Sequence, residues 1–294
     1  MISFSVITPY YKGEKYLPAL IHMVEKNLKA LQDAKIEAMV ELIIVNDSPK
    51  ETVLVPEYSD KIQVQVINHK DNSGIHQARV TGLQNCRGEY VIFLDQDDEI
   101  ADSFLHKQYI KVNGADVVVS NAYLQQKDFS MSLHFRGKGQ FKNAFEIGPY
   151  IKAHNQIISP GQCLIRKAAI PDEWKRYIIR TNGSDDLFLW VLMLLRKNSF
   201  VMNEEILYTH KFTGSNLSAE EEKMAQSSIE AASFMKKIDY VPQKMISMFM
   251  RNREMKINTR AGNTISNILL AIRNADLMLP RIWWKMRTCM GKYN

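Results

Sequence analysis

Residues 90–99, YVIFLDQDDE, carry the strongest structural signal in this chain. The run opens with five apolar or aromatic residues, which is typical of a buried strand, and the acids Asp95, Asp97 and Asp98 follow at once. Carboxylates a few ångströms apart repel one another, so one must hold a proton unless a cation lies among them. Closely spaced oxygen ligands suit Mg²⁺ or Mn²⁺, and Mg²⁺ commonly combines one or two carboxylates with substrate phosphates. The run therefore predicts a strand that presents a divalent cation to a nucleoside-diphosphate substrate.

The residues before this run alternate between strand and helix patterns. Strands are predicted at 3–8, where Pro9 ends the strand, and at 40–45 and 64–67, and helices at 15–32 and 75–86. This alternation predicts an α/β fold with a mostly parallel central sheet flanked by helices. Ligands of such sheets bind beyond the carboxyl ends of the strands, so the polar residues that follow each strand are expected at one rim.

The second half of the chain has a less regular pattern. Strands are predicted at 116–123 and 200–208, and residues 157–165 read as a loop that enters a strand. Asp185 and Asp186 precede an apolar run at 187–195, which predicts a helix whose positive end the carboxylates favour. Residues 219–239 are predicted to be helical.

Composition and charge narrow the class of protein. The longest apolar run has nine residues, short of the roughly 20 that span a bilayer, and no secretion leader is visible. Cys86, Cys163 and Cys289 lack metal-ligand spacing, which fits reduced thiols in a cytoplasmic protein. From Arg251 onward the chain carries nine basic and two acidic residues, so this tail holds +7 and residues 1–250 hold −1.

The basic tail has two interpretations. Apolar stretches at 245–250, 268–272 and 277–284 alternate with Arg and Lys, and Trp283 and Trp284 lie among them. This pattern suits a peripheral contact with the inner face of a membrane. It equally suits helices packed on the catalytic part or on a second subunit of a homodimer.

Four motifs in this sequence resemble those of one enzyme family. They are VITPYYKGEKYL (6–17), ELIIVNDSP (41–49), DNSGIHQARVTGLQNCRGEYVIFLDQDDE (71–99) and GSDDLFLWVL (183–192). In this order and spacing the chain resembles family-2 glycosyltransferases, inverting enzymes of the Rossmann-like GT-A fold that use nucleotide sugars. The resemblance is close over residues 3–125 and looser to about 218.

The resemblance implies a division of the chain. Residues 1–218 would form the GT-A catalytic domain, with a nucleotide-sugar-binding half at 1–125 and an acceptor-binding half at 126–218. Residues 219–294 would form a helical, basic C-terminal extension.

The resemblance also implies roles for the donor-site residues. Asp97 would be the direct metal ligand, and Asp95 would hold the ribose or a metal-bound water. Asp98 would serve the metal or the acceptor. The remaining donor contacts would be Asp47 on the nucleobase, Arg79 on phosphate, and Thr8, Pro9, Tyr10 and Glu14 around the base. Tyr10 equally suits plain packing, and the alternative for Arg79 is a solvent-facing helix position.

The reacting residues are implied by the later motifs. Asp186 would be the general base that deprotonates the acceptor hydroxyl, and Asp185 would orient it or contact the acceptor. His210 would reach the metal or the diphosphate. Here the chain departs from the family, whose members often carry Arg and His before a Gly-Ser pair. This sequence has His210 and Lys211, and Phe212 stands where that His would lie.

The predicted function is metal-dependent transfer of a sugar from a nucleoside-diphosphate sugar, expected to be a UDP-sugar, to a glycan or lipid-linked saccharide. A dinucleotide oxidoreductase is disfavoured because no Gly-x-Gly-x-x-Gly follows the first strand. A nucleotidyltransferase that makes sugar nucleotides, and an inactive nucleotide-sugar-binding protein, stay as alternatives. The acidic site and the −1 body argue against nucleic acid as a partner.

Overall fold

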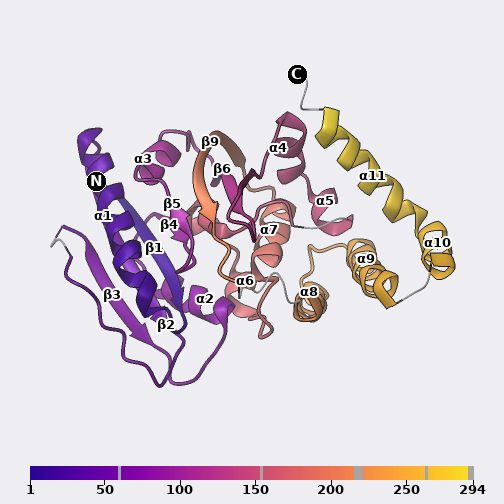
Figure 1. Ribbon diagram of the computed structural model, residues 1–294, viewed down its shortest axis with the longest axis horizontal. Coiled ribbons are helices and arrows are strands. Elements are labelled where there is room, and N and C mark those ends of the chain that lie inside the picture. Colours follow the sequence, from indigo (N-terminus) through magenta and orange to yellow (C-terminus); the bar gives the residue numbers. More distant parts are fainter. Residues whose placement is uncertain (59–60, 153–154, 215–220, 262–263, 291–294) are drawn as a thin grey trace. The chain divides into compact units, whose positions relative to one another are not determined.

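The computed structural model describes residues 1–58, 61–152, 155–214, 221–261 and 264–290 (Figure 1). The chain divides into two compact units. The first comprises residues 1–134, 157–180 and 198–216, and the second comprises 135–156, 181–197 and 217–294. Because the chain passes between the units several times, this grouping differs from the boundaries expected at 125 and 218, which stay predictions.

The first unit is built on one sheet with the strand order β3-β2-β1-β4-β8-β6-β9-β5, and β7 pairs with β6. The strands are β1 (Ile2–Tyr10), β2 (Ala38–Asn46), β3 (Gln63–Asn68), β4 (Tyr90–Phe93), β5 (Glu99–Ile100), β6 (Val117–Gln125), β7 (Met131–Leu133), β8 (Cys163–Arg166) and β9 (Phe200–His210). All four residues of β4 are buried, as the apolar run before the aspartates predicts.

The predicted α/β fold is confirmed, but the sheet is more mixed than the sequence suggested. Strands β3, β2, β1 and β4 are parallel. Beyond β4, the β4–β8, β8–β6 and β9–β5 pairs are antiparallel, and only β6–β9 is parallel. Strand alternation with helices, the signal for parallel pairing, is confined to the first half of the chain.

Helices cover the sheet of the first unit, and their bounds follow the sequence pattern. The helical elements are η1 (Glu14–Tyr16), α1 (Leu17–Asp33), α2 (Ile75–Asn85), α3 (Phe104–Tyr109), η2 (Pro160–Gln162), η3 (Lys167–Ala169) and α6 (Asp172–Arg176). Helix α1 buries Leu17, Leu20, Val24, Leu28 and Leu31, the apolar positions that recur every three or four residues. Helix α2 packs on β1 and β2.

The prediction that the first strand ends at Pro9 is wrong for its pairing with β2, which continues past this residue. Strand β1 stays paired with β2 as far as Tyr10, whereas its pairing with β4 ends at Ile7 and Phe93. In a parallel strand, alternate residues point their backbone groups to opposite neighbours. Ile7 accepts from Leu94 on the β4 side and Tyr10 accepts from Asp47 on the β2 side. The missing N–H of Pro9 therefore ends only the ladder with β4.

The second unit is helical. It contains α4 (Lys138–Ala144), α5 (Ile147–Lys152), α7 (Asp185–Leu195), α8 (Glu221–Met235), α9 (Gln243–Ala261), α10 (Thr264–Arg273) and α11 (Ala275–Met290). Helix α7 is buried along most of its length and packs against α5 and α8. Helix α9 packs against α5, and α11 packs against α4 and α5. The predicted C-terminal helices are present, and they share a core with α4, α5 and α7.

Two further expectations concern membranes and thiols. Within the described ranges, the structure has no helix that combines the length and the apolar character needed to cross a bilayer. Cys86 and Cys163 are buried and form no disulfide within the described residues. The side chain of Cys289 lies outside the described residues.

A close contact between α2 and the sheet gives a test of this packing. A Cβ at Gly82 would lie 2.3 Å from Cγ2 of Ile7, so β1 or α2 would have to shift. We expect Gly82→Ala to lower the free energy of unfolding by about 1–2 kcal/mol, although alanine favours helix. Urea unfolding measures this. The matched control, Gln84→Ala at an exposed position of α2, should stay within about 0.5 kcal/mol of the wild type. Equal stability of the two variants would contradict the packing.

Candidate functional site

The candidate site lies where the strand order reverses. The chain builds β1, β2 and β3 in one direction and then returns to place β4 on the other side of β1. In open α/β sheets such a reversal leaves a crevice beyond the carboxyl ends of the two strands. Side-chain Oε1 of Gln96 accepts from the backbone N–H of Tyr11 at 3.0 Å, and Nε2 of Gln96 donates to its carbonyl at 2.9 Å. This pair joins the loop after β1 to the loop after β4.

Asp95, the first acid after β4, is neutralised from helix α2. The guanidinium of Arg79 lies 2.6 Å from its Oδ1, and the Arg79 side chain is only 4% exposed. The alternative of a solvent-facing Arg79 is therefore wrong. A buried arginine that loses its carboxylate partner is strongly destabilising, so this ion pair holds α2 to the end of β4.

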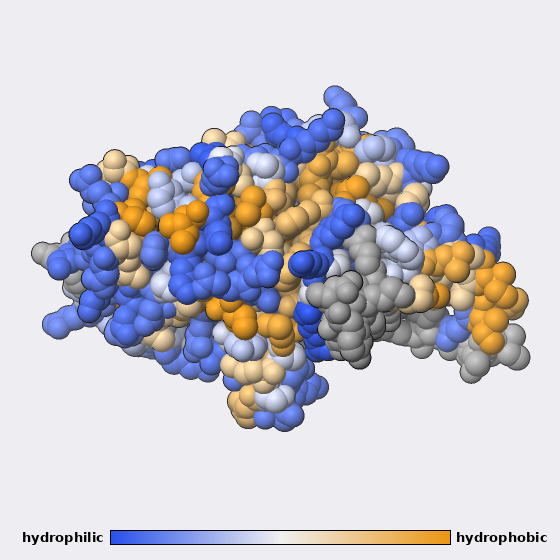
Figure 2. Space-filling view, turned by 90° about the horizontal axis from the view of Figure 1, so that it is seen from above, coloured by the Kyte–Doolittle hydropathy of each residue, from blue (hydrophilic) through white to orange (hydrophobic). Residues whose placement is uncertain are grey.

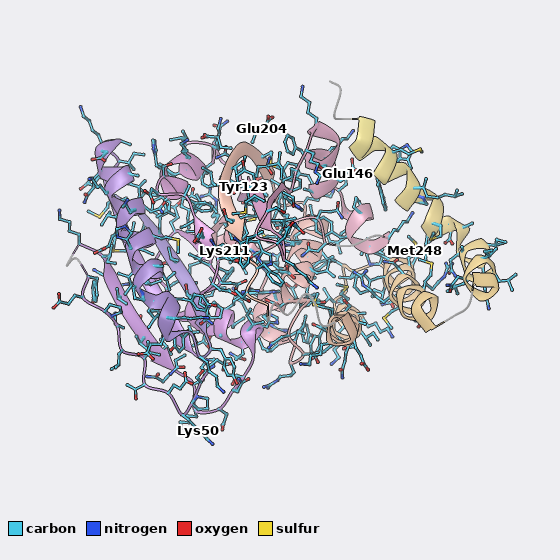
Figure 3. All side chains as sticks on the ribbon, viewed as in Figure 1. Lys50, Tyr123, Glu146, Glu204, Lys211 and Met248 are labelled. Atoms are coloured by element: carbon cyan, nitrogen blue, oxygen red, sulfur yellow. The ribbon has the colours of Figure 1, made fainter. Side chains whose placement is uncertain are left out.

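Asp98, the last acid, is engaged by the end of β9. Its carboxylate accepts from the Tyr208 hydroxyl and from the backbone N–H of Lys211, the latter at 2.9 Å. Nδ1 of His210 lies 3.1 Å from its Oδ1. Lys211, labelled in Figure 3, directly follows β9. Asp98 is 2% exposed, so this carboxylate serves to anchor β9 beside the acidic run.

Asp97 differs from its two neighbours because it makes no ion pair within the described part of the chain. Burial, then the charges of Asp98 and Asp95, raise the pKa of its carboxyl to about 6. The folded protein therefore disfavours the negative form of this carboxyl more than the unfolded chain does. A cation beside Asp97 would remove this penalty.

The residues present fit a divalent cation whose remaining ligands would come from the substrate. No group of three His, Cys, Asp or Glu side chains with metal-binding geometry occurs among the residues that the structure describes. With Asp95 and Asp98 held by protein donors, Asp97 is the one acid of the run left to ligate. One or two carboxylates plus phosphate oxygens is the common donor set of Mg²⁺.

His210 is oriented toward this acidic run. Burial lowers the pKa of its imidazole, but the hydrogen bond to Asp98 and the charges of Asp98, Asp95 and Asp97 outweigh burial and raise it. Because Nδ1 faces Asp98, Nε2 is the ring nitrogen left for another partner. The structure thus places the predicted His210 beside the acids.

Asp47 is buried at the end of β2 and organises the glycine loop. Its Oδ1 accepts from the backbone N–H of Ser73 at 2.7 Å, and its Oδ2 accepts from that of Gly74 at 2.8 Å. Nδ1 of His69 lies 2.8 Å from its Oδ1. Gly74 has φ +87°, a conformation that favours glycine. Contact of Asp47 with a nucleobase stays a prediction.

The residues predicted around the base differ in exposure. Tyr10 is 2% exposed and belongs to the hydrophobic core, which favours its packing interpretation. The Thr8 hydroxyl is buried and has no hydrogen-bond partner among the described residues. Pro9 is half-buried, and Glu14 is exposed in η1. The sequence interpretation missed Tyr11, which is about half exposed; period-two alternation from buried Tyr10 was the signal for it.

Asp185 and Asp186 lie in the second unit, in the first turn of α7 as predicted. Asp185 is buried. Oδ2 of Asp186 accepts from Nδ2 of Asn155 at 2.7 Å, and its Oδ1 accepts from the backbone N–H of Leu187 at 2.6 Å. Ser184 precedes the helix, but its hydroxyl contacts Ser228 and does not cap the helix. The roles of Asp185 and Asp186 stay predictions.

A model of the family described as Glycosyl transferase family 2 matches residues 5–174, more than half of the chain. The chain therefore belongs to glycosyl transferase family 2. This membership favours the glycosyltransferase interpretation over the oxidoreductase and nucleotidyltransferase alternatives. The matched range contains Asp47, Arg79 and the acidic run, and it ends before Asp186 and His210.

Similar proteins agree with this family. Glycosyltransferase GlyA of Streptococcus pneumoniae serotype 4 is 27% identical over 151 residues, 48% of this chain and 20% of that protein. Poly(ribitol-phosphate) beta-N-acetylglucosaminyltransferase TarS of Staphylococcus aureus is 34% identical over 103 residues, 34% of this chain and 17% of that protein. The chain thus spans a fifth or less of the length of these two relatives.

Among solved structures, residues 1–349 of S. aureus TarS in complex with UDP-GlcNAc match with a TM-score of 0.61. The alignment covers 88% of this chain and 74% of that one at 17% sequence identity. The predicted GT-A fold is thereby confirmed.

The raised pKa of Asp97 predicts a pH-dependent stability. An unfolded aspartate titrates near 3.8 and the folded Asp97 near 6, so the folded protein loses stability as pH rises between these values. Asp97→Asn removes this loss. In chelator, we expect the variant to exceed the wild type at pH 7.5 by up to about 3 kcal/mol, and the gain to shrink toward pH 4.5.

Urea unfolding at several pH values measures the difference. Asp71→Asn, at an exposed aspartate, is the matched control and should show no pH-dependent gain. A difference between Asp97→Asn and wild type that is constant with pH would refute the assignment.

Proposed function

We propose that this protein is an inverting glycosyltransferase that moves a sugar from a UDP-sugar to a glycan or lipid-linked saccharide, with a divalent cation at Asp97. The proposal rests on one difference among the three aspartates after β4: two of them are engaged by other protein groups that the structure describes and the third is not. Arg79 and the end of β9 engage Asp95 and Asp98, and Asp97 is left with a pKa raised to about 6. Mg²⁺ and Mn²⁺ are the cations we propose.

The donor is proposed from chemistry and from similarity. A nucleoside diphosphate supplies the phosphate oxygens that a single carboxylate leaves unfilled around a cation. TarS has been solved with UDP and with UDP-GlcNAc, which makes UDP-GlcNAc the first donor to test. We propose that the base lies near Asp47 and the exposed ring of Tyr11, with Thr8 and Pro9 beside them.

The reaction proposed is a direct displacement. The acceptor hydroxyl attacks the anomeric carbon, the bond from that carbon to the β-phosphate oxygen breaks, and its electron pair leaves with UDP. The hydroxyl proton passes to Asp186, the proposed general base, which Asn155 orients. A cation bound at Asp97 would stabilise the negative charge that UDP gains.

Further roles follow by proximity. We assign Asp95 to the positioning of Arg79 and of a metal-bound water, and Asp98 to the positioning of His210, whose Nε2 faces the cation or diphosphate. Asp185 supports Asp186. A cytoplasmic location and a homodimer stay predictions.

Donor binding tests the cation site. We expect Mn²⁺ with UDP-GlcNAc to raise the melting temperature of the wild type by several degrees, and chelator to abolish the shift. Asp97→Asn should lose the metal-dependent shift. Asp102→Asn, at an exposed aspartate that lies outside the acidic run and pairs with Lys26, should retain it. Full stabilisation of the wild type by UDP-GlcNAc in chelator would disprove the metal assignment.

Turnover tests the base. Asp186→Asn should keep the thermal shift with UDP-GlcNAc and Mn²⁺ but lower UDP release with a panel of saccharide acceptors by about 10²–10⁴-fold. Asp239→Asn, an exposed aspartate of the same unit, should behave as wild type. Unchanged turnover in Asp186→Asn rejects that residue as base. Donor binding without any wild-type turnover supports the alternative of an inactive nucleotide-sugar-binding protein.

A further inference from the structure

Helix α11 carries apolar residues on two opposite sides. One side is docked within the second unit: Leu277 is fully buried, and Trp284 approaches α5 so closely that a Cβ at Gly148 would lie 3.1 Å from its ring. Residues 277 and 284 are seven positions apart, so they lie on the same side of the helix. This side of α11 thus holds a buried leucine and the tryptophan that contacts α5.

The opposite side of α11 is apolar and exposed. Each of its four members is at least 47% exposed, and they follow one another at spacings of three, one and three: Leu279, Ile282, Trp283 and Met286. This spacing places them in one stripe along the helix. The contact of Trp284 with α5 does not account for the stripe, because Trp284 lies on the other side of the helix.

Helix α10 adds a second exposed stripe. Ile268, Leu269 and Ile272 are each at least 55% exposed. Figure 2 shows apolar residues gathered at the right-hand end of the molecule, where Figure 1 has α10. Single exposed apolar residues are ordinary, but a gathered set on two consecutive helices indicates a binding surface. We name these seven side chains the α10–α11 apolar face.

The sequence of this segment carries a net positive charge. Asp276 is the one acid between residues 264 and 294, a stretch that contains five basic residues. Both oxygens of Asp276 are taken by Arg251 of α9, at 2.9 and 3.0 Å, and Arg251 also donates to Oδ1 of Asn274 between α10 and α11. The acid is therefore neutralised inside the unit, and the same contacts fix the junction of the two helices.

We propose that the α10–α11 apolar face docks on an anionic lipid surface. Apolar side chains of an interfacial helix enter the boundary of the acyl chains, tryptophan favours the headgroup level, and cations are attracted by anionic lipids. A symmetric dimer through the same face would bring two basic helices together, which charge disfavours. The proposal is independent of the catalytic one, since lipid binding is measured without any nucleotide sugar.

Vesicle sedimentation of the full chain tests the proposal. We expect binding to vesicles of phosphatidylcholine with phosphatidylglycerol, weak binding to phosphatidylcholine alone, and weakening by salt. The triple variant Leu279→Gln, Ile282→Gln, Met286→Gln should lower the partition coefficient by at least about tenfold. Its melting temperature should match the wild type, because the replaced side chains are exposed and glutamine favours helix.

The matched control replaces three exposed apolar residues of the first unit, Leu54→Gln, Ile110→Gln and Phe129→Gln, and should bind vesicles within about twofold of wild type. Equal binding by wild type and the α11 triple variant would overturn the proposal. So would a lipid-free dimer, seen in sedimentation velocity, that the α11 triple variant converts to monomer, because the face would then cover a second copy.

Discussion

Electrostatic repulsion among three carboxylates at the end of one buried strand shapes the first unit. Asp95, Asp97 and Asp98 follow β4 with no basic residue between them, and the folded chain meets the repulsion by bringing donors from other elements. Arg79 comes from α2, and Tyr208, His210 and Lys211 come from the end of β9. The site is therefore assembled by charge compensation, and the compensation is incomplete at Asp97.

This incomplete compensation links stability to ligand binding. A carboxylate whose pKa is raised to about 6 costs the folded protein free energy at neutral pH, and the cation that we propose would return that free energy. Asp95 and Asp98 are already held by Arg79 and by the end of β9. Under the proposed function, a cation would change the charge balance at Asp97 alone, which suits a preorganised site.

The second unit is held together by packing between helices from two parts of the chain. Its helices α4, α5 and α7 come from the middle of the chain, and α8 to α11 close over them. Arg251 neutralises the only acid of the last two helices. Helix α11 buries apolar residues on one side and exposes apolar residues on the other. The same helix therefore contributes both to the core of this unit and to its apolar surface. The predicted interpretations of the tail, packing or membrane contact, are thus compatible with each other.

The strand and helix pattern, the α/β fold and the family could be predicted from the sequence, because period, turn residues and motif spacing are local properties of the chain. It also brought Asp97 and His210 forward as candidates. The three-dimensional structure was needed to show that Arg79 pairs with Asp95, that Asp98 anchors β9, that Tyr10 is core and that Tyr11 is exposed. These outcomes depend on partners 16 and 112 residues apart in sequence, such as Arg79 with Asp95 and His210 with Asp98. The strand order of the sheet brings these distant charges together, and no local sequence pattern encodes that order.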